Sequence, residues 1–200
     1  MLVIGLTGGI GMGKSTAANV FRRARVPVFD ADATVHALQA PGGRALPALA
    51  AAFPGTVGTD RQGRRLLDRA ALRARVLADP AALRRLEAII HPLVRLEEKK
   101  FIARARRAGE NLVVLDIPLL LETGGARRVD FVLVVSAPRP VQIARVRRRR
   151  RMSTAEITAV LARQMPDGEK RRRADLVVPT GLSRYHAART IRRLIRKLRR

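Results

Sequence analysis

Eight residues near the start of the chain combine the groups needed to bind a polyphosphate. Residues 8–15 read Gly-Gly-Ile-Gly-Met-Gly-Lys-Ser, which fits the phosphate-binding pattern G-x-x-x-x-G-K-[ST]. Glycines let the backbone wrap closely around phosphates, Lys14 can reach the β- and γ-phosphates, and the Ser15 hydroxyl can bind Mg²⁺. The apolar run 2–6 before this loop predicts a buried strand, and residues 16–21 favour a helix. The segment therefore predicts a nucleoside triphosphate site.

Acidic side chains follow two further predicted strands. Asp116 closes the apolar run 112–116, where nucleotide-binding α/β proteins place an acid near Mg²⁺, although an ordinary turn or cap role stays open. Asp30 and Asp32 follow a short predicted strand at 26–29. Ligands of parallel sheets lie at the carboxyl ends of strands, so we expect these acids near the phosphate loop. Asp32 is the favoured group to accept or orient the proton of an attacking hydroxyl, with Asp30 as a helix cap or metal neighbour.

Arginines supply candidate phosphate ligands. In the basic run 145–151, Arg145 and Arg149 share one helix face, so they are the candidates to close over the phosphates. We interpret the other arginines of this run as solvated or as loose anion ligands. The basic segment 192–200 is amphipathic, and we expect it to belong to a terminal helix that packs its apolar residues on the sheet.

Composition limits the class of protein. The 200 residues fit one domain with a small inserted lobe, and the absence of cysteine excludes disulfides and thiol chemistry. A net charge of +25, from 41 basic and 16 acidic residues, attracts polyanions, but 3% aromatic residues leave little material for stacking nucleic-acid bases. The three histidines lack metal-ligand spacing, and no apolar stretch reaches membrane-spanning length. We therefore expect a cytoplasmic protein.

The order of elements predicts an α/β fold. Short apolar runs at 2–6, 26–29, 112–116, 131–135 and 176–178 predict strands, and helices fit 138–149, 154–164 and 183–198. Continuous apolar strands separated by helices indicate a parallel sheet covered on both faces. The stretch 44–107 is predicted to contain helices and no strand, with a break at His91-Pro92. We interpret this stretch as an insertion that forms a lid or an acceptor lobe.

Together the motifs resemble the dephospho-coenzyme A kinase family along nearly the whole chain. The matching pieces keep the family's order: the loop at 5–15, Phe29-Asp30-Ala31-Asp32 with His36, Leu67-Asp68-Arg69, Ile89-Ile90-His91-Pro92, residues 116–122, residues 141–145, Arg149 before Met152-Ser153, Gln164-Met165-Pro166, Lys170 and Ala174-Asp175. The family usually has a small residue at Met12, and we expect tolerance there because only backbone amides are needed. It usually has Asp-Asn where this chain has Pro179-Thr180.

The resemblance implies a fold and a reaction. The fold is that of P-loop kinases, with a five-stranded parallel core sheet, flanking helices, a helical lid and a substrate-binding insertion. The reaction is transfer of the ATP γ-phosphate to the ribose 3′-hydroxyl of dephospho-CoA. It implies that Asp32, Lys14 and Arg149 are catalytic. It also implies ATP contacts from Gly9, Gly11, Met12, Gly13, Lys14, Ser15, Thr16 and Arg145, acceptor contacts from Asp32, His91, Asp116, Pro118 and Leu119, and Mg²⁺ contacts from Ser15 and Asp116.

We expect residues 1–200 to form a single kinase domain, with a CoA-binding insertion at 44–107 and a lid at 145–165. ATP and dephospho-CoA are the expected partners, with no specific nucleic acid and no membrane. We expect a monomer, with an oligomer left open.

Two alternatives remain at this point. One is another small-molecule kinase of the adenylate or shikimate type, which would share the phosphate loop but leave the other motifs unexplained. The other is a basic nucleotide-dependent switch that binds RNA or protein. Residues 60–63 fit the D-x-x-G pattern of GTPases, but no strand is predicted before them. The guanine-reading Asn-Lys-x-Asp motif is absent because the only asparagines are Asn19 and Asn111.

Overall fold

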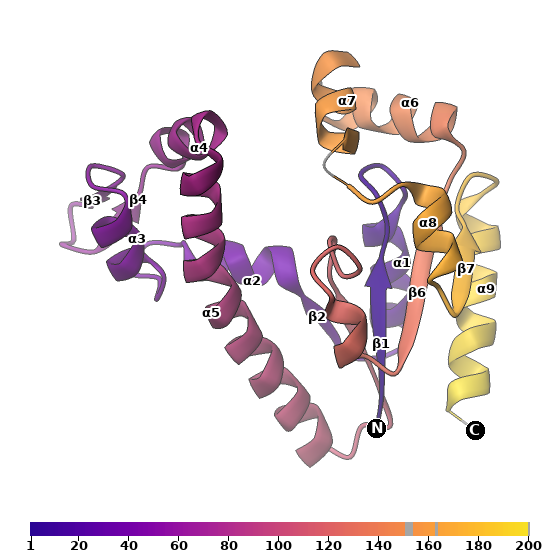
Figure 1. Ribbon diagram of the computed structural model, residues 1–200. Coiled ribbons are helices and arrows are strands. Elements are labelled where there is room, and N and C mark those ends of the chain that lie inside the picture. Colours follow the sequence, from indigo (N-terminus) through magenta and orange to yellow (C-terminus); the bar gives the residue numbers. More distant parts are fainter. Residues whose placement is uncertain (151–153, 163, 200) are drawn as a thin grey trace. The chain divides into compact units, whose positions relative to one another are not determined.

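The structure, a computed structural model, describes residues 1–150, 154–162 and 164–199; the side chains of residues 78, 149, 150, 154, 155 and 159 are left out of that description. The described chain divides into two compact units (Figure 1). The first comprises Met1–Asp30 and Ile102–Arg200, and the second comprises Ala31–Phe101. The expected insertion at 44–107 largely falls within the second unit, and its boundaries stay a prediction.

The first unit contains most of the α/β elements. Its strands are β1 (Leu2–Thr7), β2 (Val28–Asp30), β5 (Leu112–Asp116), β6 (Phe131–Ser136) and β7 (Leu176–Pro179). Its helices are α1 (Lys14–Arg23), η1 (Gly125–Arg128, a 3₁₀ helix), α6 (Arg139–Arg150), α7 (Thr154–Ala162), α8 (Asp167–Arg172) and α9 (Arg184–Leu198). The sequence did not predict η1 or α8.

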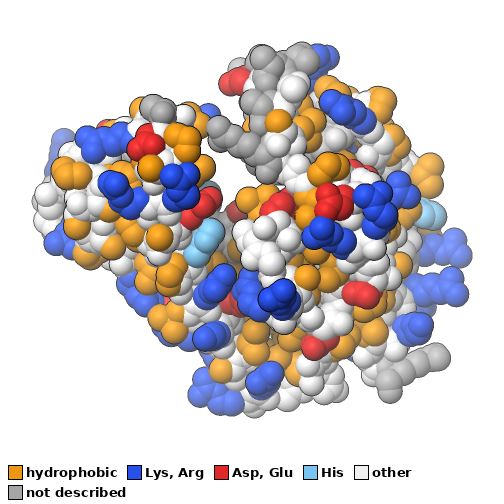
Figure 2. Space-filling view, viewed as in Figure 1, with side chains coloured by type: hydrophobic (Ala, Val, Ile, Leu, Met, Phe, Trp, Pro, Cys, Tyr) orange, Lys and Arg blue, Asp and Glu red, His pale blue; other side chains and the backbone are white. Residues whose placement is uncertain are grey.

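The surface is strongly basic. Figure 2 shows Lys and Arg side chains spread across the visible face. Among the described residues, no helix combines the length and the apolar character needed to cross a membrane.

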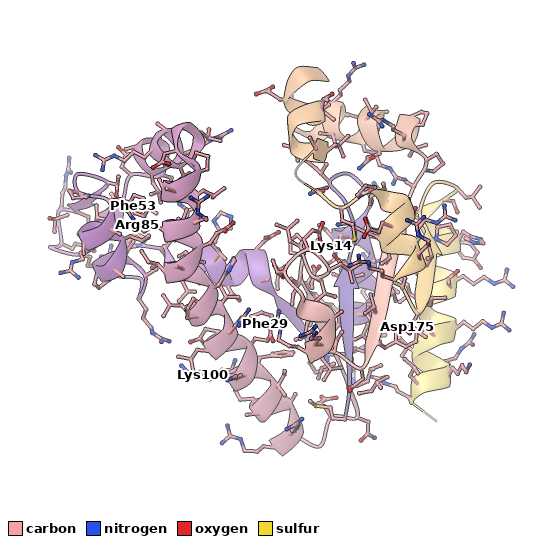
Figure 3. The ribbon with its side chains drawn as sticks, in the orientation of Figure 1. Lys14, Phe29, Phe53, Arg85, Lys100 and Asp175 are labelled. Carbon is pink, nitrogen blue, oxygen red and sulfur yellow. The ribbon has the colours of Figure 1, made fainter. Side chains whose placement is uncertain are left out.

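A parallel sheet organises the first unit. Among the described residues the sheet has five strands in the order β2-β5-β1-β6-β7, and every pairing is parallel. Asp175, labelled in Figure 3, helps to set the register, because its carboxylate accepts a hydrogen bond from the Val132 N–H at 2.7 Å. The predicted parallel α/β core is confirmed.

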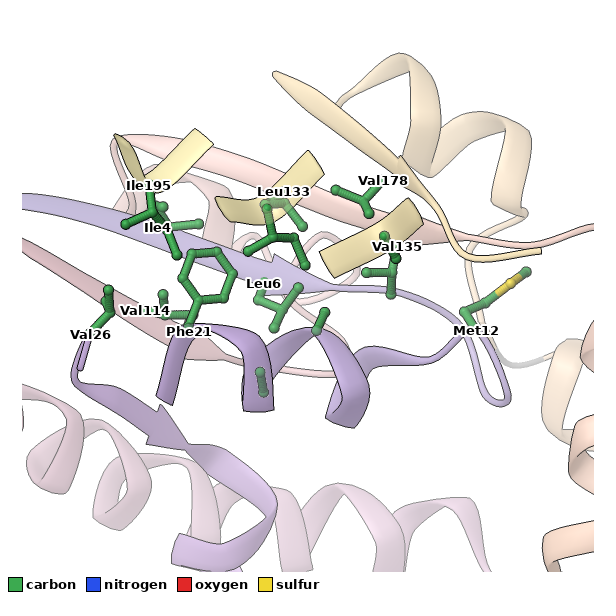
Figure 4. Close-up of a cluster of buried hydrophobic side chains, with 14 of the residues drawn as sticks. Ile4, Leu6, Met12, Phe21, Val26, Val114, Leu133, Val135, Val178 and Ile195 are labelled. Carbon is green, nitrogen blue, oxygen red and sulfur yellow. The ribbon is translucent and has the colours of Figure 1, made fainter. Parts of the chain in front are cut away.

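Alternating side chains of β6 bury both faces of this sheet. Leu133 and Val135 enter the larger core with Phe21 of α1 and Ile195 of α9 (Figure 4). Val132 and Val134 face a second cluster that includes Leu120. The terminal helix packs as predicted, with its apolar side chains buried or partly buried in the larger core: Ile191, Leu194, Ile195 and Leu198. This two-sided burial explains why the strands read as continuous apolar runs.

The second unit has its own core. It contains α2 (Ala31–Leu38), α3 (Leu46–Ala52), β3 (Val57–Thr59), β4 (Arg65–Leu67), α4 (Arg69–Ala78) and most of α5 (Pro80–Arg107), which ends in the first unit. Apolar side chains from these elements form one buried cluster, with Phe53 among them.

Two predictions for the second unit are wrong. The stretch 44–107 does contain strands, because β3 and β4 pair as an antiparallel hairpin. A strand thus precedes Asp60, whose carboxylate accepts hydrogen bonds from the Gln62 and Arg64 N–H groups and closes the turn. Residues 60–63, which fit the D-x-x-G pattern, therefore form the turn of a small antiparallel hairpin. They do not follow a strand of the parallel sheet.

His91-Pro92 does not break the helix either, because α5 runs continuously through Pro92. Pro92 has no N–H to donate to the Ala88 carbonyl, a loss that usually kinks or ends a helix. Here Ile90, Leu93 and Val94 around the proline pack in the cluster of the second unit. This packing stabilises the helix on both sides of the proline.

Candidate active site

The phosphate loop, residues 8–15, connects β1 to α1 as predicted. Gly11 and Gly13 have φ angles of 74° and 90°, which side chains disfavour. A Cβ at Gly11 would lie 2.7 Å from Cγ2 of Val146, so the loop also lacks space for one. The glycines therefore fix a loop that leads into the N-terminus of α1, where backbone N–H groups can bind an anion.

Met12 has a role that the sequence did not predict. Its side chain is 3% exposed and belongs to the core, and its Sδ accepts a hydrogen bond from the Ala137 N–H at 3.0 Å. The Met12 side chain thus anchors the phosphate loop to the segment after β6. A small residue here would keep the loop amides but lose this anchor.

An ion pair connects the loop to the neighbouring strand. The Lys14 Nζ lies 2.7 Å from Oδ1 of Asp116, and Asp116 is only 3% exposed. Leu6 of β1 is paired with Asp116 of β5, which places this acid at the strand edge from which the loop leaves. Burial raises the pKa of Asp116 above its ordinary value of 3.8, and the opposing attraction of Lys14 does not cancel this effect.

Asp30 lies at the same edge, aligned with Asp116 in the pairing of β2 with β5. Its Oδ2 is 3.1 Å from the Arg22 guanidinium, so Asp30 pairs with α1. Asp32 follows two residues later in the first turn of α2, in the second unit. The sheet thus brings Asp30 and Asp116 to the edge from which the loop leaves, whereas Asp32 belongs to the other unit.

Arg145 lies beside the phosphate loop. Its guanidinium donates to the carbonyl of Thr180 at 2.6 Å and to the Thr180 hydroxyl at 3.2 Å. That hydroxyl donates to the Met12 carbonyl at 2.7 Å. A cavity of about 150 Å³ is lined by residues that include Gly13, Thr16, Arg145 and Thr180. Thr180 therefore links the end of the last strand to the phosphate loop and to α6. It is the residue that stands where the resembled family usually has asparagine.

The remaining predicted residues are dispersed. The side chain of Arg149 lies outside the described part of the structure. The Thr7 hydroxyl donates to the Pro118 carbonyl at 2.8 Å, which holds the segment after β5 at the end of β1, and Leu119 is exposed there. His91 is exposed on α5 in the second unit. Gly9 lines a larger cavity of about 670 Å³ beside α6 and α8.

Oxygen ligands for a cation are present at the loop. Ser15 is exposed in the first turn of α1, and the Asp116 carboxylate lies at the adjoining strand end. Hydroxyl and carboxylate oxygens are hard ligands that suit Mg²⁺ when substrate phosphates complete its coordination. Within the described residues, no group of three or more His, Asp or Glu side chains forms a ready-made metal site. The residues fit a magnesium ion shared with a nucleotide.

Comparison with known proteins decides the family. A sequence model described as dephospho-CoA kinase matches residues 2–183. The chain belongs to the dephospho-CoA kinase family. A dephospho-CoA kinase of Gluconobacter oxydans is 54% identical over 203 residues, which cover 100% of this chain and 98% of the relative. One from Paramagnetospirillum magneticum is 61% identical over 171 residues, covering 86% of this chain and 78% of the relative.

Solved structures agree with the fold. A crystal structure of a Thermus thermophilus protein matches with a TM-score of 0.83 at 37% identity and covers 98% of this chain and 97% of its own. A dephospho-CoA kinase from Campylobacter jejuni matches with a TM-score of 0.71 at 20% identity, covering 98% and 96%. A shikimate kinase from Bacteroides thetaiotaomicron has a TM-score of 0.53 at 15% identity, covering 100% and 99%, so it shares the fold alone. The predicted P-loop kinase fold and family are confirmed, and the chain is an ATP-dependent kinase of this family.

Proposed function

We propose that this kinase transfers the γ-phosphate of ATP to the ribose 3′-hydroxyl of dephospho-CoA and releases CoA and ADP, the last step of CoA biosynthesis. The observation that carries the proposal is the Lys14–Asp116 ion pair beside a glycine loop, in a chain that matches dephospho-CoA kinases from end to end. The loop offers a phosphate site, and the family relationship supplies the acceptor.

The phosphate site has four components. The amides of residues 9–16 and the N-terminus of α1 bind the phosphate oxygens. Lys14 exchanges its contact with Asp116 for the β- and γ-phosphates, where its charge stabilises the transition state. Ser15 and Asp116 would hold Mg²⁺, which neutralises charge on the phosphates when bound. Arg145 and Arg149 add positive charge from the lid, proposed at 145–165.

Asp32 is the proposed catalytic carboxylate. It orients the 3′-hydroxyl and accepts its proton as the new oxygen–phosphorus bond forms and the bond from the γ-phosphorus to ADP breaks. Asp32 follows β2, whose last residue is aligned with Asp116 at the edge that carries the phosphate loop. Chain continuity therefore keeps its backbone within two residues of that edge.

The acceptor has its own proposed contacts. His91 on α5 and the 44–107 insertion bind the CoA portion, and Pro118 and Leu119 contact the acceptor near the end of β5. Mg²⁺ dependence, a monomeric state and a cytoplasmic location belong to the same proposal, in which the basic surface captures polyanionic substrates rather than a specific nucleic acid.

An acceptor panel tests this function. ADP release from ATP and Mg²⁺ is measured with dephospho-CoA and, in parallel, with AMP, adenosine, shikimate or no acceptor. The expected result is turnover mainly with dephospho-CoA, with CoA identified by mass. Preference for another acceptor, or equal ATP hydrolysis without one, contradicts the proposal.

A further inference from the structure

Two glutamines hold the same residue of the phosphate loop. The Ile10 N–H donates to Oε1 of Gln164 at 3.0 Å. Nε2 of Gln142 donates to the Ile10 carbonyl at 2.8 Å. Both backbone polar groups of Ile10 are therefore satisfied by side chains from outside the loop. Gln142 is only 4% exposed, so its contact is shielded from water.

The backbone fixes the direction of each bond. An amide N–H can only donate, so Gln164 must present its oxygen to Ile10. A carbonyl can only accept, so Gln142 must present its NH₂ group. The two glutamines thus have opposite roles toward one residue, and they are not interchangeable.

The two contacts come from two separate parts of the first unit. Gln142 is the fourth residue of α6, and Gln164 follows α7, whose last residue is Ala162. Side chains from α6 and from the segment after α7 therefore meet at Ile10, between Gly9 and Gly11 of the loop.

The adjoining glycine is shaped for these contacts. A Cβ at Gly9 would lie 3.2 Å from Nε2 of Gln142 and 3.2 Å from Oε1 of Gln164. Both approaches are tighter than ordinary van der Waals contact, so a side chain at Gly9 would push the amides away. Gly9 thus leaves room for the pair.

A buried ion pair fixes the backbone next to Gln164. Oε1 of Glu122 accepts a hydrogen bond from the Met165 N–H at 3.1 Å and lies 2.6 Å from Nζ of Lys170. The Lys170 side chain is 1% exposed. Since Glu122 follows β5 and Lys170 belongs to α8, the backbone next to Gln164 is held by two other parts of the first unit.

We propose that Gln142 and Gln164 are positioning residues that hold the phosphate loop at Ile10 and link it to α6 and to the segment after α7. The inference rests on the proposed function, because it assigns the loop to ATP. The glutamines act through the peptide groups of Ile10 and set the loop shape that receives the phosphates. Losing either contact is expected to lower turnover, and to raise ATP hydrolysis without acceptor relative to CoA formation, because the loop no longer holds the γ-phosphate in place for the acceptor hydroxyl.

The opposite bond directions provide a matched test. Gln142→Glu and Gln164→Glu add the same charge beside the same residue, but only Gln142→Glu removes the required donor. We expect Gln142→Glu to lower kcat on the order of tenfold, since it leaves a buried carbonyl without a donor, and Gln164→Glu to stay within about threefold of wild type. Gln142→Met and Gln164→Met each remove one of the two contacts without adding a charge, and both variants are expected to lose turnover.

The readouts are kcat and KM for ATP, the ratio of acceptor-free ATP hydrolysis to CoA formation, and the melting temperature. Equal behaviour of the two Glu variants, or lower melting temperatures with unchanged kcat and hydrolysis ratio, overturns the inference. Should Gln142→Glu not fold, the two Met variants decide by the hydrolysis ratio. A wild-type enzyme that makes no CoA defeats the proposed function instead, so the two failures are distinguishable.

Discussion

The ammonium of Lys14 lies 2.7 Å from Oδ1 of Asp116, so the phosphate-loop lysine and the acid that ends β5 form an ion pair. The pair joins the first residue of α1 to the end of β5, the strand that neighbours β1 in the sheet. The Lys14 charge attracts the buried carboxylate of Asp116, and Asp116 in turn holds the Lys14 side chain at the loop before any phosphate binds.

Replacing Lys14 with Ala should abolish most turnover. The variant loses the cation proposed to stabilise the transferring phosphate, and removing one such stabiliser costs about 100-fold or more in kcat. It also leaves the buried Asp116 without its partner, so the melting temperature should fall. Steady-state kinetics and thermal unfolding measure both effects, with Lys197→Ala on the exposed side of α9 as the control. Normal turnover would exclude the loop from the reaction.

The raised pKa of Asp116 predicts how stability depends on pH. A folded-state pKa above the unfolded value means that folding favours the protonated acid. The contribution of Asp116 is therefore most favourable below pH 3.8 and is lost as the pH rises through the folded-state value. Urea unfolding of wild type and Asp116→Asn, without nucleotide or Mg²⁺, isolates this contribution. The wild-type free energy of unfolding minus that of the variant should fall with rising pH; a difference that rises would mean a lowered pKa.

The parallel sheet and the loop were predictable because their signals are local. The apolar run, the glycines and Lys14-Ser15 are contiguous, and the rule for parallel strand ends places Asp116 beside them. The small hairpin was not predictable, since β3 and β4 have only three residues each and carry no continuous apolar run. The break predicted at Pro92 was wrong for a similar reason, because α5 is kept continuous by tertiary packing that the local sequence does not show.

The contacts around Ile10 could not be predicted from the sequence at all. Ile10 is 132 residues from Gln142 and 154 from Gln164, so no local pattern connects them. The sequence marked both glutamines as parts of family motifs but gave no reason for them. The ion pair of Lys170 with Glu122 was hidden for the same reason, because only the fold brings α8 to the segment after β5. The role of Met12 could not be predicted from its residue type either, because its sulfur accepts a hydrogen bond inside the core.

Asp32→Asn should separate ATP binding from chemistry. Asparagine keeps the shape of the side chain but is not expected to accept the proton of the 3′-hydroxyl, and general bases contribute about 10²- to 10⁴-fold. We expect ATP affinity within about twofold of wild type, because the loop residues are unchanged, and a loss of turnover of that order. Isothermal titration with ATP and measurement of CoA formation check the two parts.

Asp30→Asn is the matched control for this prediction. It changes the same functional group two residues earlier, where the carboxylate pairs with Arg22. We expect a much smaller loss of turnover than in Asp32→Asn. Near-normal turnover of Asp32→Asn, or a larger loss in Asp30→Asn, would reassign the base.

Arginines next to the phosphate loop should speed the capture of ATP. A groove of about 390 Å³ between α1 and α9 is lined by residues that include Thr16, Arg23, Arg184 and Arg192, and Thr16 also lines the cavity at the loop. The sequences of both helices contain no acidic residue to offset this charge. Positive potential beside a site raises the local concentration of a polyanion, and salt screens it.

The double variant Arg184→Ser/Arg192→Ser should therefore lower kcat/KM for ATP on the order of threefold to tenfold at low ionic strength, with the difference vanishing at high salt. Arg106→Ser/Arg107→Ser removes the same charge from the end of α5, which leads to the start of β5 at the opposite edge of the sheet. This control should keep the wild-type salt dependence. If both double variants lose the same fraction of kcat/KM, the effect comes from net charge, and the groove has no special part in capture.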